Sequence, residues 1–295
     1  QVGLLVLVGV AIAPPSPTHA QPSPVPEDAS VERIAEGLEF TEGPIWYEGR
    51  LLFSDIPANR VYAWTPEEGT QIVLEPSGHA NGLAVDRRGR LLLAQHDGQV
   101  GRHVEGDSVE TLVEEYEGQR LNSPNDLDVA ADGAIYFTDP PYGVDEADRE
   151  LDVSGVYRLS PDGDLALLTK RFSHPNGIVF SPDESTLYVN DSEDTVIWAY
   201  DVTDEGTLTN GREFAAPEAE ADGTTDGMAV DANGTLYTTG PGGVWIYAPD
   251  GTRLDRISVP EPPTNVAFGG PENQTLYITA QSSVYRVGVN VPGAK

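Results

Sequence analysis

The chain has no cysteine and only two lysines, Lys170 and Lys295, among its 295 residues. Without thiols it cannot form disulfides, use a thiolate nucleophile or bind a soft-metal cluster, so its core alone must stabilise the fold. Asp and Glu outnumber Lys and Arg by 48 to 17, which gives a formal net charge of −31. A field of this sign repels nucleic acid and anionic membranes, and both are therefore excluded as partners.

The acidic, lysine-poor composition also indicates an environment. Proteins in concentrated salt tolerate such a surface because screening weakens the repulsion between like charges. The sequence therefore favours a halophilic source. The alternative is an ordinary acidic exported protein, whose composition is unrelated to a saline environment.

The first 30 residues differ in composition from the rest. Residues 1–20 contain the apolar run LLVLVGVAIA and end in Thr18-His19-Ala20, which loosely fits a cleavage site. The run is too short for a comfortable membrane-spanning helix. Residues 21–30 are rich in Pro and Ser and predict a flexible linker. We expect a signal peptide over 1–20 whose basic start is missing, no stable membrane span in the mature chain, and export to the periplasm, cell envelope or exterior.

Residues 31–290 repeat one unit six times. Each unit has a polar residue, a short β-pattern, a turn of Gly, Asp, Asn or Pro, and a second β-pattern. We call the polar residues the anchors: they are Glu42, Asn81, Asn125, Asn176, Asp226 and Asn265, spaced by 39 to 51 residues. This strand-only period predicts an all-β fold, a six-bladed β-propeller forming one domain. Residues 31–38 are expected to complete the last blade and close the ring. A two-sheet sandwich would explain the strands but not six equivalent anchors.

The anchors predict a central metal site. The first strand of each propeller blade lines the central channel, so the anchors should face the axis at one height. Asn and Asp also suit the turn before a strand, which is the alternative explanation for any one of them. Two carboxylates in a narrow channel repel each other, and a dication removes that penalty. Oxygen donors without thiolate or imidazole favour Ca²⁺, with Mg²⁺ or Mn²⁺ as alternatives and Zn²⁺ disfavoured. We predict Glu42, Asn125, Asn176 and Asp226 as metal ligands.

A second set of polar residues ends the return strands, 13 to 15 residues after the anchors. An up-and-back strand pair returns the chain to the same end of the blade, so these side chains should surround the pocket. Asp55 and Asp191 suit a role as strand-end turn formers. We predict that Asp139 and His96, together with the anchor Asn81, contact the substrate.

Four motifs resemble the gluconolactonase and regucalcin-like family of six-bladed propeller lactonases, which includes diisopropylfluorophosphatase-like hydrolases. They are Glu42-Gly43-Pro44, Ser123-Pro124-Asn125-Asp126, Pro175-Asn176-Gly177 and Asp226-Gly227-Met228, within a match that covers nearly all of residues 38–288. FTDPPYG, which contains Tyr142, further resembles the bacterial gluconolactonase branch, and we add Tyr142 to the predicted substrate contacts. Ser123 stands where the animal branch has Arg, so the sugar-acid specificity of that branch is not carried over.

The resemblance implies one divalent metal, commonly calcium, held by Glu42, Asn176 and Asp226, with Asn125 contacting substrate or completing the metal shell. It also implies hydrolysis of a small-molecule sugar lactone, in which Asp226 acts as general base or nucleophile and Asn125 orients the substrate. Two alternatives share the fold. One is a phosphotriesterase-like hydrolase at the same metal, and the other is a non-catalytic secreted propeller with structural calcium. We expect a monomer or dimer.

Overall fold

The computed structural model describes residues 23–218 and 221–294. The predicted signal peptide and the first two residues of the predicted linker lie outside these ranges. All regular elements in the described part of the chain are β-strands. No helix there is long and apolar enough to cross a membrane.

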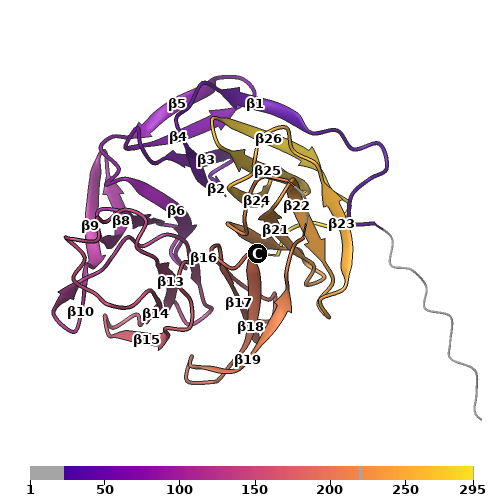
Figure 1. Ribbon diagram of the computed structural model, residues 1–295. Helices are drawn as coiled ribbons and strands as arrows, with labels where there is room; N and C mark the ends of the chain where they lie inside the picture. Colours follow the sequence, from indigo (N-terminus) through magenta and orange to yellow (C-terminus); the bar gives the residue numbers. More distant parts are fainter. Residues whose placement is uncertain (1–22, 219–220, 295) are drawn as a thin grey trace, which may run out of the picture.

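Six four-stranded antiparallel sheets surround a central axis, as Figure 1 shows. The predicted six-bladed propeller is therefore confirmed. Blades 1 to 3 are β2 (Thr41–Tyr47), β3 (Arg50–Asp55), β4 (Arg60–Thr65), β5 (Gly69–Leu74); β6 (Ala80–Val85), β7 (Leu91–Gln95), β8 (Gln99–Glu105), β9 (Ser108–Val113); and β12 (Leu127–Val129), β13 (Ile135–Asp139), β14 (Gly155–Leu159), β15 (Leu165–Thr169). A small hairpin of β10 (Glu115–Tyr116) and β11 (Gln119–Arg120) lies between blades 2 and 3 in the sequence.

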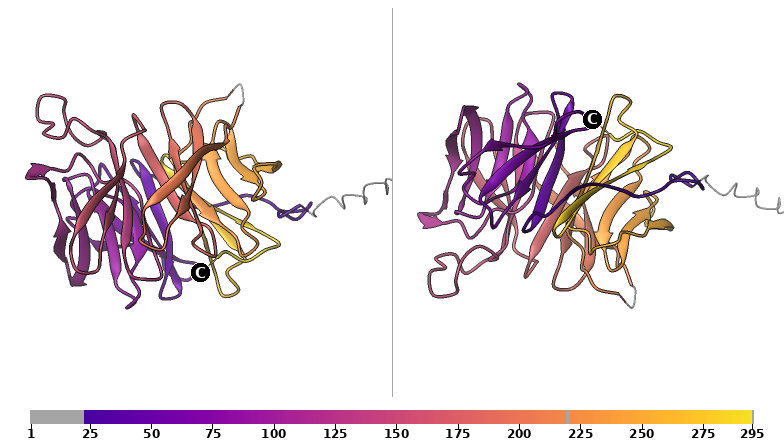
Figure 2. Two further views of the ribbon diagram at one scale, coloured as in Figure 1. Left: turned by 90° about the horizontal axis from the view of Figure 1, so that it is seen from below. Right: turned by 90° about the horizontal axis from the view of Figure 1, so that it is seen from above.

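The second half of the chain builds the other three blades. They are β16 (Pro175–Phe180), β17 (Thr186–Asp191), β18 (Val196–Val202), β19 (Leu208–Ala215); β20 (Met228–Val230), β21 (Leu236–Gly240), β22 (Gly243–Tyr247), β23 (Arg253–Ile257); and β24 (Asn265–Gly269), β25 (Thr275–Ala280), β26 (Ser283–Gly288) with β1 (Glu32–Glu36). Seen from the side, the strands run between the two faces of the ring, and the C-terminus lies at one of them (Figure 2).

The N-terminal strand closes the ring. β1 pairs antiparallel with β26, with Glu32 opposite Arg286, as predicted for residues 31–38. The aromatic ring of Trp46 in blade 1 stacks on Tyr277 in blade 6 at 5.5 Å between centroids. The start of the chain thus completes the last blade through a backbone ladder, and the first and last blades also pack against each other.

The core lies between neighbouring blades. Inner strands such as β13 and β21 are buried along their whole length, whereas the outermost strand β19 is largely exposed. Leu92 and Val100 of blade 2 pack in one cluster with Phe137 and Tyr157 of blade 3. Because each sheet is covered on both faces by its neighbours, its inner strands are apolar on both sides, and polar residues remain only at the strand ends.

Residues 23–30, for which a flexible linker is predicted, lie against blades 5 and 6. Val25 and Ala29 pack on the apolar cluster of these blades. Ser23 Oγ donates to a carboxylate oxygen of Asp255, and Asn290 Nδ2 donates to the Ser23 carbonyl. The packed part of this segment therefore differs from a free tether.

Candidate metal centre

The anchors stand at the start of the innermost strands. Glu42, Asn81, Asn176 and Asn265 lie in β2, β6, β16 and β24, while Asn125 and Asp226 lie two residues before β12 and β20. These six strands neighbour one another in a closed circle. Five anchors are at most 6% exposed, and Asp226 is half-buried. Turn chemistry alone does not require such burial, so these polar groups need partners.

Glu42 is the most constrained anchor. Its Oε2 accepts hydrogen bonds from the Gly43 amide at 2.7 Å and from Asn265 Nδ2 at 2.9 Å. Burial nevertheless raises the pKa of Glu42 to about 7, because the two hydrogen bonds offset only part of the cost of removing the carboxylate from water. A positive charge at this point would relieve that cost.

Asp226 lies within the electrostatic reach of Glu42. Burial raises the pKa of Asp226 well above its usual value, and the negative charges of Glu42 and Asp126 raise it further. A hydrogen bond from the Asn176 side chain acts in the opposite direction. The three residues predicted as metal ligands by resemblance are thus brought together at one end of the axis.

Asp126 is a third carboxylate that the sequence analysis did not select. It is 8% exposed, and its Oδ1 accepts from the Leu127 amide at 2.9 Å. Burial, followed by the charge of Glu42, raises its pKa to about 8. In the sequence Asp126 directly follows an anchor. Strand alternation is expected to turn such a side chain away from the anchor's direction, so the repeat did not select it.

The donor set fits a hard divalent cation. In residues 23–218 and 221–294 no three His, Asp or Glu side chains are placed to hold a metal ion by themselves. Two carboxylates, Glu42 and Asp226, would therefore need the amide oxygens of Asn176 and Asn125 as further ligands. Oxygen-only sets of this kind suit Ca²⁺ better than zinc. A dication would also offset the cost of three buried carboxylates.

Asn81 and His96 form a pair beside the anchors. Asn81 Nδ2 lies 3.1 Å from His96 Nε2, while Asn81 Oδ1 is buried without a hydrogen-bond partner. Burial lowers the pKa of His96 to about 4, so the imidazole is neutral near pH 7 and can accept from the Asn81 amide. Asn81 Oδ1 can then accept a hydrogen bond from a hydroxyl group of a ligand.

Tyr142 reaches the centre from the connection between β13 and β14. Its hydroxyl shares a hydrogen bond with Ser192 Oγ, and its ring lies 5.2 Å from the His174 ring. Loss of water around the hydroxyl raises the pKa of Tyr142 to about 12; the charge of Asp226 also raises it, and a hydrogen bond with Asn176 lowers it. The hydroxyl therefore lies next to two predicted ligands, whereas the side chain as a whole is 47% exposed.

Asp139 occupies a different environment from the one predicted. It is fully buried, and its Oδ2 accepts from the backbone amide of Asn122 at 2.9 Å. Asp55 accepts from the Phe40 amide and Asp191 from the Ser173 amide in the same way. Each of these strand-end residues thus accepts a hydrogen bond from the backbone of the segment that leads into its own blade. In Asp139 this involves Oδ2, whereas Oδ1 is buried without a hydrogen-bond partner.

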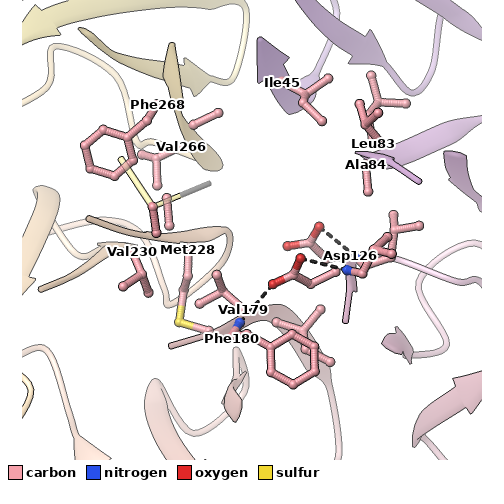
Figure 3. Close-up of a pocket in the computed structure, with 18 of the residues that line it drawn as sticks. Ile45, Leu83, Ala84, Asp126, Val179, Phe180, Met228, Val230, Val266 and Phe268 are labelled. Atoms are coloured by element: carbon pink, nitrogen blue, oxygen red, sulfur yellow. Dashed lines mark hydrogen bonds between the residues drawn. The ribbon is translucent and has the colours of Figure 1, made fainter. Parts of the chain in front are cut away.

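Away from the anchors the central channel is lined by both apolar and polar residues. A cavity of about 420 Å³ is lined by first-strand residues, including Ile45, Leu83, Val179 and Met228. Figure 3 shows Asp126 as the acidic residue labelled among these side chains. Arg87, Asp128 and Glu184 also line this cavity, so charged groups are present along the axis beyond the anchors as well.

The fold and the site together define a six-bladed β-propeller in which buried carboxylates and amides converge on the axis. The chain belongs to the SMP-30/gluconolactonase/LRE-like family, whose model matches residues 40–282.

Three relatives show how far the similarity extends. A gluconolactonase of Zymomonas mobilis is 40% identical over 288 residues, covering 87% of this chain and 80% of the relative. The pentonolactonase XacC of Haloferax volcanii is 33% identical over 85% of this chain and 84% of its own length. A solved structure of a gluconolactonase from Xanthomonas campestris is 37% identical, covers 92% of this chain and 94% of its own, and superposes with a TM-score of 0.86.

Proposed function

We propose that this protein is a calcium-dependent lactonase that hydrolyses a sugar lactone to its hydroxy acid. The observation that carries the proposal is the convergence of Glu42, Asn176 and Asp226 at the anchor end of the axis, where burial disfavours the negative charges of the two carboxylates. The relatives named gluconolactonase and pentonolactonase support a lactone as the substrate. The donor set supports calcium.

Each residue has a role that follows from its place. Glu42, Asn176 and Asp226 would hold the cation and Asn125 would complete its shell or orient the substrate. When bound, the cation supplies charge stabilisation for the carbonyl oxygen as its carbon becomes tetrahedral. Asn81 Oδ1 and the Tyr142 hydroxyl are placed to hold substrate hydroxyl groups.

Asp226 is the group that handles the proton. Because it is half-buried, a water molecule can reach it, and it can accept a proton from that water as the water oxygen attacks the lactone carbonyl carbon. The bond between the carbonyl carbon and the ring oxygen then breaks. The proton passes to the ring oxygen, which leaves as the hydroxyl of the product, and the new carboxylic acid ionises.

The test is a metal-depletion assay. Protein stripped by a chelator and refilled with Ca²⁺ is offered glucono-1,5-lactone, pentonolactones and, in parallel, a fluorophosphate. We expect lactone hydrolysis that is lost on stripping, restored by Ca²⁺ and absent in Asp226→Asn. Equal lactone turnover with and without metal would contradict the proposal, and faster turnover of the fluorophosphate would assign the site to phosphotriesters.

We also propose that the protein is exported, because residues 1–20 have the pattern of a signal peptide. Expression of the full chain with N-terminal sequencing of the secreted product tests this. Cleavage after Ala20 is the expected outcome, and retention of an intact N-terminus inside the cell would contradict it.

A further inference from the structure

A second set of residues surrounds the axis beneath the anchors. It is formed by the next-to-last residue of the second strand in each blade: Ser54, Ala94, Thr138, Asn190, Thr239 and Thr279. All six are fully buried, and five are polar. A buried polar side chain costs free energy unless it is hydrogen-bonded, so their partners show what they do.

Three of these side chains donate to the backbone carbonyl of the anchor in the next blade. Ser54 Oγ donates to Asn81 O at 2.7 Å, and Thr138 Oγ1 donates to Asn176 O at 2.7 Å. Asn190 Nδ2 donates to Asp226 O. The anchor carbonyls are therefore turned sideways, toward the preceding blade, and are held there.

The close approach of the blades depends on a glycine. A Cβ added to Gly177 would lie 2.3 Å from Asp226 O, a distance that real Cβ atoms do not reach. Any other residue at 177 would push the Asp226 backbone outward. Gly177 is thus required by the spacing between blades 4 and 5, independently of the side chain of Asn176.

Asn190 connects the backbones of two predicted ligands. Its Oδ1 accepts from the Gly177 amide at 3.1 Å, while its Nδ2 donates to Asp226 O. Because Thr138 Oγ1 donates to Asn176 O, both the carbonyl and the amide of the peptide unit between Asn176 and Gly177 are hydrogen-bonded to side chains. Thr138 has a similar arrangement one blade earlier: its Oγ1 accepts from the Asp126 amide at 3.1 Å and donates to Asn176 O.

We propose that Asn190 is a positioning residue of the metal centre: it does not touch the ion but fixes the separation of Asn176 and Asp226. This inference rests on the proposed cation site. The fold itself does not need a polar group at this position, because blade 2 has Ala94 there, and the anchor Asn125 that follows is held by the Gly82 amide instead. Asn190 is hydrogen-bonded to the backbone at both Asn176 and Asp226, which are predicted ligands. We therefore attribute its polar side chain to the metal centre and not to the fold.

The experiment measures Ca²⁺ binding to chelator-stripped protein by calorimetry, with no substrate present. Asn190→Val and Asn190→Thr have nearly the same shape, but only the Thr variant keeps a hydroxyl that can donate to Asp226 O. Residues that orient metal ligands typically contribute about 10- to 100-fold to metal affinity. We expect a loss of that order in Asn190→Val and recovery of most of it in Asn190→Thr.

A matched control is Ser54→Ala. It removes the same kind of hydrogen bond, to the anchor Asn81, which is not a predicted ligand. We expect it to lower the melting temperature of the metal-free protein while leaving Ca²⁺ affinity unchanged. A merely structural role for Asn190 would give the same pattern in Asn190→Val, namely lower stability with wild-type affinity, and that result would overturn the proposal.

Two further outcomes are distinguishable. If Asn190→Val does not fold, Thr138→Val compared with Thr138→Ser makes the same test through Asn176 O, and equal affinities of this pair would also overturn the proposal. If the wild-type protein does not bind Ca²⁺, the metal centre is refuted and the positioning role with it. Wild-type binding together with unchanged variants would refute only the role of Asn190.

Discussion

Asn265 donates a 2.9 Å hydrogen bond to Oε2 of Glu42 and so joins the last blade to the first at the candidate metal centre. Both side chains are buried. The orientation of one predicted ligand therefore depends on closure of the ring, which the pairing of β1 with β26 completes. The last blade is therefore needed both to close the ring and to orient Glu42.

The first prediction concerns the cost of the Glu42 charge. Glu42→Gln keeps an oxygen that can accept from Gly43 and Asn265 but removes a buried charge. With Glu42 ionised at pH 8, we expect the metal-free variant to be more stable than the metal-free wild type by about 3 kcal/mol, since burial raises the pKa of Glu42 from 4.5 to about 7. The same variant should no longer be stabilised by Ca²⁺.

Chemical unfolding in chelator and in Ca²⁺ measures both effects. A variant that is less stable than the wild type in chelator would show that the Glu42 charge is already compensated by the protein. Asn265→Asp is a useful comparison, because it places a further carboxylate against Glu42. It should destabilise the metal-free protein.

The anchors could be predicted from the sequence because they repeat at the start of six similar strands. Asp126 and Asn190 could not, since their significance depends on which residues of a neighbouring blade lie beside them. In the sequence Asn190 is only one of the two polar residues that end LYVND, and nothing in that segment indicates contact with Asp226, 36 residues later. Asp139 shows the converse: its position in the repeat predicted a pocket residue, whereas its carboxylate fastens Asn122.

The second prediction concerns His96 and acid. Burial lowers the pKa of His96 to about 4, below the ordinary value of 6.5. Between these values the unfolded chain binds a proton at this side chain that the folded protein does not, so the contribution of His96 to stability should fall as the pH drops from about 6.5 to 4. Above pH 6.5 this contribution is constant.

Unfolding free energies across that pH range, compared between wild type and His96→Gln, test this. As the pH drops through this range, the wild type should lose stability relative to the variant, with a difference in slope of at most one proton because only one group is removed. His103→Gln, which changes a histidine outside the site, serves as control and should keep the wild-type slope. Identical slopes for all three proteins would count against a neutral, buried His96.

The third prediction concerns salt. Exposed ion pairs such as Arg60–Glu75 and Arg286–Glu32 contribute little to stability and weaken in salt. Repulsion among the uncompensated acidic groups, with a net charge of −31, weakens as well and should dominate. Raising KCl from about 0.1 to 2 M is expected to raise the melting temperature by about 5 °C.

Sucrose at matched osmolarity is the control, because it favours compact states without screening charge. A halophilic protein should respond more strongly to KCl than to sucrose. An equal response to both solutes would indicate that solute exclusion, not screening, stabilises the fold, and the halophilic hypothesis would then be wrong.

The fourth prediction concerns Tyr142. Tyr142→Phe removes the hydroxyl that pairs with Ser192 but keeps the ring beside His174. If the hydroxyl holds a substrate hydroxyl equally in the ground and transition states, its loss raises KM and leaves kcat nearly unchanged. One such hydrogen bond is worth about 1 kcal/mol, so KM should rise roughly 5-fold. Ser192→Ala, which frees the hydroxyl without removing it, should have a smaller effect.

Steady-state kinetics on glucono-1,5-lactone at saturating Ca²⁺ separate the two constants. A fall in kcat with KM unchanged would instead place the Tyr142 hydroxyl in the chemical step, beside Asp226, because only interactions made in the transition state alone act on kcat in this way.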